Sequence, residues 1–223
     1  MYKIIFFLIL GFLFSCNFVD VSDFSESTKI FNNNNDTATK YIDFPICINK
    51  DSSEFVVFPI KYDQSRNKGY YSSYEYDYYY GEMNSNLIFY NLNNGDHYLI
   101  DENDVNIKSI SFVYSQNLGL IFYTVASEDT NEDGFWTFQD DSQLAVSDNQ
   151  GKNYRIITPT NFNLLSWNVF TKNNFVIVRM IEDTNKDGKY ELKNDKIKIE
   201  KIDLKNFNQE EIFDKEFIEK ATK

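Results

Sequence analysis

Two short acidic segments carry the side chains best suited to holding a metal ion. Residues 128–134 and 182–188 are identical at six of seven positions, at an offset of 54. Calcium takes about six to eight oxygen ligands, and carboxylate or amide oxygens at alternate positions of a tight turn converge on one point. The glycine that ends each segment lets the next backbone carbonyl join them. The candidate ligands are Asp129, Asn131, Asp133 and the carbonyl of Phe135 in the first loop, and Asp183, Asn185, Asp187 and the carbonyl of Lys189 in the second.

A further carboxylate is needed to close each loop. Asp141 and Asp195 are also 54 residues apart and are therefore the favoured closing ligands, with Asp140 as a competitor. The Asp-x-Asn-x-Asp-Gly opening resembles that of EF-hand calcium loops, which close with a glutamate at position 12 between two helices. Because the flanking residues here are β-type, we expect weak calcium sites that rigidify β-hairpins. Asp, Asn and Gly also form ordinary turns, so a metal-free interpretation stays open.

The acidic loops belong to a longer repeat. Residues 120–123 and 175–178 are matching apolar runs at an offset of 55, and residues 55–58 followed by 63–69 form a degraded third copy. Each loop leads to another β-type run. A unit is thus three or four short strands in roughly 55 residues, rich in β-branched and aromatic side chains, which favours an antiparallel meander.

The middle copy carries a more specific likeness. Residues 144–158 read Leu-Ala-Val-Ser-Asp-Asn-Gln-Gly-Lys-Asn-Tyr-Arg-Ile-Ile-Thr. This stretch resembles the propeller repeats of periplasmic Tol-system-type proteins and related lipoproteins, and the resemblance covers residues 55–204. It implies an all-β fold of antiparallel, blade-like repeats. Closed propellers have about 4 to 8 blades, so the three recognisable units need either a fourth blade that includes residues 41–48, or open or sandwich packing.

The carboxyl end has a different pattern. In residues 208–220, Phe213 and Phe217 are four apart, so a helix would place both rings on one side. We expect a short helix that covers an open end of the β domain, with partner binding as the alternative.

The amino terminus has the layout of an export signal. Lys3 precedes an apolar run over residues 4–14 that is too short to span a bilayer, which needs about 20 residues. Residues 13–16, Leu-Phe-Ser-Cys, resemble the lipobox of bacterial lipoproteins, which implies cleavage after residue 15 and lipidation of Cys16. Residues 16–40 are then a flexible tether and residues 41–223 the β-repeat domain. The predicted location is the cell envelope, anchored to a bacterial membrane, in our interpretation the outer one. An ordinary secretory signal is the alternative.

Charge and cysteine usage narrow the function classes. A formal net charge of −12 repels phosphate backbones, so nucleic acid is not an expected partner. With Cys16 committed to lipid, Cys47 has no disulfide partner and is expected to be a buried, inert thiol.

A tyrosine-rich insertion in the first unit is the candidate binding surface. Its rings would stack on sugars or pack against a protein partner, or alternate ones would pack on the core. The candidate contact residues are Tyr74, Tyr76, Tyr78, Tyr79 and Tyr80.

Catalysis has little support in the sequence. His97 is the only histidine and follows Asp96 in a turn, which favours a solvated surface role. We therefore expect a non-enzymatic, lipid-anchored protein- or glycan-binding module stabilised by calcium. The alternative is an envelope hydrolase whose acidic loops hold a catalytic metal.

Overall fold

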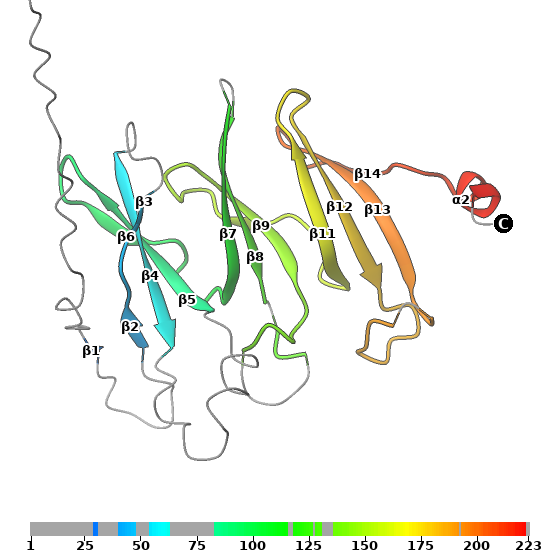
Figure 1. Cartoon of the computed structure of the whole chain (residues 1–223), viewed down its shortest axis with the longest axis horizontal. Helices are drawn as coiled ribbons and strands as arrows, with labels where there is room; N and C mark the ends of the chain where they lie inside the picture. The colour runs from blue at the N-terminus through cyan, green and yellow to red at the C-terminus, as the bar shows by residue number, and fades with distance from the viewer. Residues whose placement is uncertain are drawn as a thin grey trace, which may run out of the picture.

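The chain folds into three antiparallel sheets that stack face to face, followed by one short helix (Figure 1). The computed structural model describes residues 29–30, 40–47, 54–62, 83–115, 118–126, 128–130, 136–191 and 193–221. The all-β fold with a short carboxyl-terminal helix, predicted from the sequence, is confirmed. No helix in these residues is long and apolar enough to cross a membrane.

Each sheet is one repeat unit. The first unit contains β1 (Lys29–Ile30), β2 (Lys40–Ile42), β3 (Ile46–Cys47), β4 (Phe55–Tyr62), β5 (Asn84–Asn91) and β6 (His97–Leu99). The second contains β7 (Ile107–Ser115), β8 (Leu118–Val125), β9 (Gln143–Asp148) and β10 (Arg155–Ile156). The third contains β11 (Phe162–Phe170), β12 (Phe175–Glu182), β13 (Lys196–Asp203) and β14 (Gln209–Glu211).

The packing between units is open. The first two units share a hydrogen-bonded ladder, but only through the pair Asn84 and Ile107, whereas the third is a separate sheet. The residues from 41 onward that were considered for a fourth blade form β2 and β3, which both pair with β4. They extend the first unit, so three stacked units account for the described strands.

The alternation of side chains along β8 explains why the units stack. Ile121 and Tyr123 point toward the first unit and pack with Phe89, whereas Phe122 points the other way and packs with Val176 of the third unit. Successive side chains of a strand face opposite sides of the sheet. The middle unit is therefore buried on both faces, which accounts for its nearly continuous apolar sequence.

Strand register places the connecting loops on one edge. Asn84, the first residue of β5, pairs with Ile107, the first residue of β7. Ile107 also pairs with Val125, the last residue of β8. Val125 in turn pairs with Gln143, the first residue of β9, and the start of β9 is hydrogen-bonded to the start of β11. The acidic loop after β8 and the two ends of the tyrosine-rich insertion thus lie along the same edge.

The predicted helix over residues 208–220 is too long. Residues 209–211 instead form β14, which pairs with β13 and so has a sheet partner for its backbone. The helix, α2 (Lys215–Ala221), begins after Asp214, whose Oδ1 accepts a hydrogen bond of 2.7 Å from the backbone N–H of Phe217. This is a helix N-cap, and it fixes the start of the helix. The rings of Phe213 and Phe217 do lie together, stacked with centroids 5.3 Å apart.

Candidate metal centre

The loop between β12 and β13 folds the three predicted side chains of its opening onto one turn. Asp183 accepts hydrogen bonds from the backbone N–H groups of Asp187 and Gly188, at 3.2 and 3.0 Å. Asn185 Oδ1 also accepts from the N–H of Asp187, at 3.0 Å, and its amide donates to Asp187 Oδ2 at 2.9 Å. Asp187 Oδ1 accepts from the N–H of Lys189 at 2.9 Å. The structure therefore brings Asp183, Asn185 and Asp187 together.

Gly188 is required for this turn. Its φ is +74°, in the left-handed region that side chains other than glycine rarely adopt. This conformation reverses the chain so that the backbone from Lys189 onward returns past the acidic side chains. The predicted role of the sixth loop position as a bend is confirmed by its backbone.

Asp195 closes the same loop by binding its backbone. Oδ1 accepts from the N–H and the hydroxyl of Thr184, at 3.0 and 3.2 Å, and Oδ2 accepts from the N–H of Glu191 at 2.8 Å. The hydrogen bond from Glu191, with those from Thr184, lowers the pKa of Asp195. Asp195 is thus an ionised clasp across the loop.

In the loop between β8 and β9, the equivalent clasp is Asp140. Its Oδ1 accepts from the N–H of Thr130 at 3.0 Å, and its Oδ2 accepts from the N–H of Thr137 at 2.6 Å. Thr130 and Thr137 precede Thr184 and Glu191 by 54 residues, yet Asp140 precedes Asp195 by 55. The first loop is one residue shorter before its clasp. Asp140, the competitor in the sequence, and not Asp141 therefore occupies the position of Asp195.

Asp141 instead links the two loops. Its carboxylate accepts a hydrogen bond from the hydroxyl of Tyr190, which lies in the second loop. Burial raises the pKa of Asp141 to about 6, against the opposing effects of Lys108 and of this hydrogen bond. Burial, followed by the charges of Asp141 and Asp183, raises the pKa of Tyr190 to about 12. The acidic groups of both loops therefore act on one tyrosine.

A lysine from β7 supports the end of the first loop. Lys108 Nζ donates to Ser142 Oγ at 2.9 Å, to the carbonyl of Phe138 at 3.4 Å and to the carbonyl of Asp140. Burial lowers the pKa of Lys108 to about 8, although Asp140 and Asp141 oppose this shift. The ammonium group thus neutralises charge beneath the loop. The sequence gives no local signal for this role, because Lys108 lies more than 30 residues from Asp140.

The oxygens of the second loop fit a hard cation such as calcium. Asp183, Asn185 and Asp187 supply carboxylate and amide oxygens and Lys189 a carbonyl, which are ligand types that calcium prefers. Glu191, two residues beyond Lys189, was missed in the sequence; its carboxylate accepts from the Asn194 amide at 2.7 Å. Within the described residues, no three His, Cys, Asp or Glu side chains form a metal-binding group.

Several predicted site residues fall outside the described part of the chain. Asp129 of the first loop is described and half-buried. The remaining residues lie outside the described residues: Cys16, Asn131, Asp133, Phe135, Tyr74, Tyr76, Tyr78, Tyr79 and Tyr80, as does the side chain of Cys47.

No protein-family model and no curated protein matches the chain. The function of the site is therefore inferred from its own geometry.

Proposed function

We propose that this chain is a lipid-anchored β-repeat protein of the bacterial cell envelope that binds two structural calcium ions and serves as a protein- or glycan-binding module, without catalytic activity. The observation that carries the proposal is the second acidic loop. Asp183, Asn185 and Asp187 point onto one turn, and Gly188 reverses the backbone there.

A structural role for calcium follows from where the loops lie. Each acidic loop joins the two central strands of its unit, and the Tyr190–Asp141 hydrogen bond joins one loop to the other. Carboxylates gathered in one turn repel one another, and a bound cation removes that repulsion. Calcium would therefore stiffen the edge where the second and third units meet. Asp183, Asn185, Asp187 and Glu191 would hold the ion in the second loop.

A binding role is supported by the tyrosine-rich insertion. The insertion leaves β4 after Tyr62 and returns just before Asn84, which lies in the same register row as the first acidic loop. Tyrosine gives a large contact area at low entropy cost, which suits a recognition surface. A calcium-stiffened edge would hold the ends of that surface in place.

A calcium titration of the chelator-treated full chain tests the metal part of the proposal directly. Calorimetry should report two sites per chain, with dissociation constants of about 10⁻⁴ to 10⁻³ M, the range of extracellular calcium modules. Asp187→Ala should remove one of the two sites. The absence of calcium binding at millimolar concentration would overturn the proposal.

A further inference from the structure

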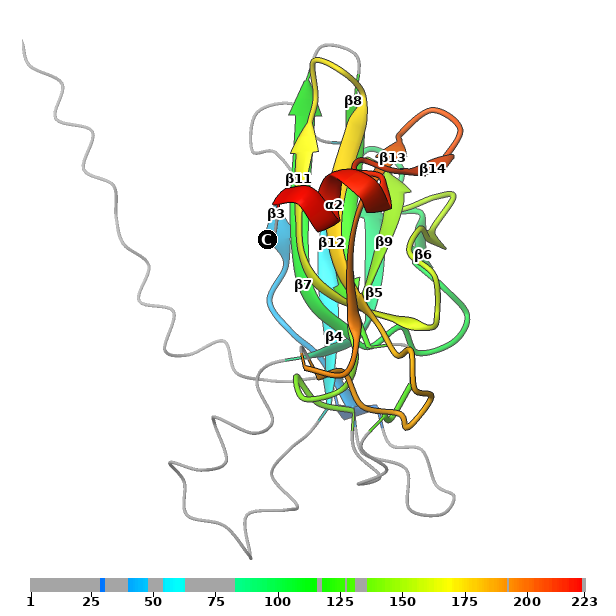
Figure 2. The same cartoon turned by 90° about the vertical axis from the view of Figure 1, so that its right-hand side faces the viewer.

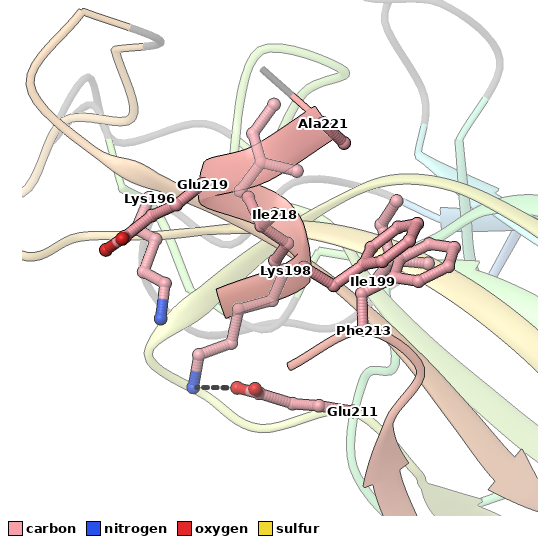
Figure 3. A pocket seen from close by; sticks show the side chains of 10 residues that line it. Lys196, Lys198, Ile199, Glu211, Phe213, Ile218, Glu219 and Ala221 are labelled. Carbon is pink, nitrogen blue, oxygen red and sulfur yellow. Dashed lines mark ion pairs between the residues drawn. The ribbon is translucent and has the colours of Figure 1, made fainter. Parts of the chain in front are cut away.

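A pocket of about 530 Å³ lies between the outer face of the third unit and α2 (Figures 2 and 3). This site is separate from the acidic loops. In Figure 2 the helix crosses in front of the third sheet as an additional layer. The pocket is therefore enclosed by β13 on one side and by the carboxyl-terminal segment on the other.

The walls of the pocket are apolar. Ile197 and Ile199 of β13 line one side, and Phe213, Phe217 and Ile218 line the other. The last three side chains keep 40%, 53% and 39% of their surface exposed. In a helix with a good N-cap, such exposure means that the apolar side of the helix faces open space instead of packed protein. An apolar occupant would bury this surface.

The segment that holds the helix is itself well anchored. β14 pairs with β13 directly before the helix, and Asp214 caps the first turn. Phe213, just before the cap, lines the pocket together with Ile218, in the positions of a hydrophobic staple, which fixes the angle at which a chain enters a helix. The pocket therefore has a defined wall on the helix side.

The charged residues at the pocket are unevenly engaged. Lys198 forms ion pairs with Glu182 at 3.5 Å and with Glu211 at 3.7 Å. Lys196 is exposed and forms no ion pair with any residue that the structure describes. Figure 3 shows the ammonium groups of Lys196 and Lys198 on one side of the pocket and the ring of Phe213 on the opposite side. The site thus has a cationic end and an aromatic end.

We propose that this pocket binds a single-chain amphiphile with an anionic head group, of the fatty-acid class. The apolar chain lies between Ile199 and the Phe213–Phe217 pair, and the carboxylate lies at Lys196. The volume falls within the roughly 300 to 1,000 Å³ of small-molecule sites, which combine apolar walls with a few polar groups that orient the ligand.

The repeat shows why a small ligand fits this face better than another sheet. Ile177 on the outer face of the third unit corresponds, at an offset of 55, to Phe122, which packs the second unit onto the third. A fourth sheet would stack there at a spacing of about 10 Å. In this chain α2 occupies that layer (Figure 2), so a second copy has no room to dock its sheet. What remains is the cavity beneath the helix.

Dodecanoate binding to the full chain, measured by calorimetry below the micelle-forming concentration, tests the proposal. We expect one high-affinity site that Phe217→Glu weakens at least about tenfold, because it places a charge in the apolar wall. Lys196→Gln should weaken binding by about two- to fivefold, as expected for one exposed ion pair. Lys205→Gln, at the far end of β13, removes the same charge and should have no effect. Neutral dodecanol should bind wild type and Lys196→Gln equally.

Three outcomes would overturn the proposal. Binding of dodecanoate that is equal in wild type and Phe217→Glu would place the ligand elsewhere on the chain. Equal binding of dodecyltrimethylammonium and dodecanoate would remove the role of the lysine. Sedimentation that shows a wild-type dimer and a monomeric Phe217→Glu variant would identify the face as a self-association surface.

Discussion

The hydroxyl of Tyr190 donates a hydrogen bond to the carboxylate of Asp141, and this contact joins the two acidic loops. The loops belong to different sheets, so the bond also fastens the second unit to the third. Ser142, the next residue, adds a hydrogen bond of 2.9 Å from its N–H to Asn163 Oδ1 at the start of β11. The loop edge is therefore a polar seam that complements the apolar core between the same two sheets.

Loss of the tyrosine hydroxyl should weaken this seam. Tyr190→Phe keeps the ring and should lower the free energy of unfolding by about 1.5 kcal/mol, the low end for a hydrogen bond to a charged group. The pKa of Asp141 should rise above its value of about 6, because this hydrogen bond lowers it. Urea unfolding and an NMR titration of the Asp141 carboxyl measure the two effects. Tyr90→Phe, whose hydroxyl bonds to none of the described residues, is the control and should change neither quantity.

Close contact between the first two units depends on Gly151. This glycine has a φ of +80°, and a Cβ at this position would overlap the ring of Phe89 in the first unit. Gly151→Ala should therefore destabilise the fold by about 3 kcal/mol or more, from backbone strain and overpacking together. Gly188 has a φ of +74° but no atom within 4 Å of such a Cβ. Gly188→Ala should cost only the strain, about 1 to 2 kcal/mol. Equal losses in urea unfolding of the two variants would contradict the close contact.

A buried glutamate in the third unit should make stability depend on pH. Glu200 is 8% exposed, its Oε2 has no hydrogen-bond partner among the described residues, and burial raises its pKa from the ordinary 4.5. The folded chain therefore holds this proton more tightly than the unfolded chain, so the free energy of unfolding falls as the pH rises through the raised pKa. Glu200→Gln should be more stable than wild type at neutral pH. The difference should vanish well below pH 4.5.

The measurement for Glu200 is a series of urea unfolding curves from acidic to neutral pH. Glu54→Gln, an exposed change at the start of β4, is the matched control and should leave the pH profile unchanged. A Glu200→Gln variant that is less stable than wild type at neutral pH would show that the Lys198 charge outweighs burial at this site.

The sequence predicted the parts of the fold that depend on local pattern. The β-type runs that start at Phe55, Leu120 and Phe175 are the central strands β4, β8 and β12. Alternating side chains specify a two-sided strand wherever it packs, so the pattern was sufficient for the meander. Residues 208–214 were misassigned because helical spacing of Phe213 and Phe217 does not reveal that β13 offers a pairing edge to the preceding residues.

The details of the candidate site depended on contacts that sequence spacing does not show. An offset of 54 favoured Asp141, but the first loop is one residue shorter before its clasp, and Asp140 binds the backbone in place of Asp195. Tyr190 and Lys108 were missed for a similar reason. Their partners are distant along the chain and are brought close only by the stacking of the sheets.

Membrane anchoring remains a prediction that a single substitution tests. Cys16→Ala should release the chain from the membrane fraction or block its processing, because lipid on that cysteine is the proposed anchor. Cell fractionation and detergent phase partition measure both effects. Cys47→Ala is the matched control and should leave the chain membrane-bound. A Cys16→Ala variant that is correctly cleaved and still needs detergent for release would refute lipidation at this site.

Calcium should raise the melting temperature of the chain. An ion that binds only the folded state stabilises it by mass action, by about 2.7 kcal/mol per site at 100 times the dissociation constant. Combining Asp129→Ala with Asp183→Ala removes the first carboxylate of each loop and should abolish most of this response. The double variant need not be less stable without calcium, because the substitutions also relieve repulsion between carboxylates in each loop.

The calcium experiment compares melting curves of chelator-treated chain with and without millimolar calcium. Asp96→Ala, in an exposed turn away from both loops, is the control and should keep the full calcium response. Magnesium should have a weaker effect, since it demands near-ideal octahedral geometry and dehydrates reluctantly. A wild-type chain that melts at the same temperature in both conditions would mean that residues 129–141 and 183–195 are Asp/Asn/Gly turns held by their own hydrogen bonds alone.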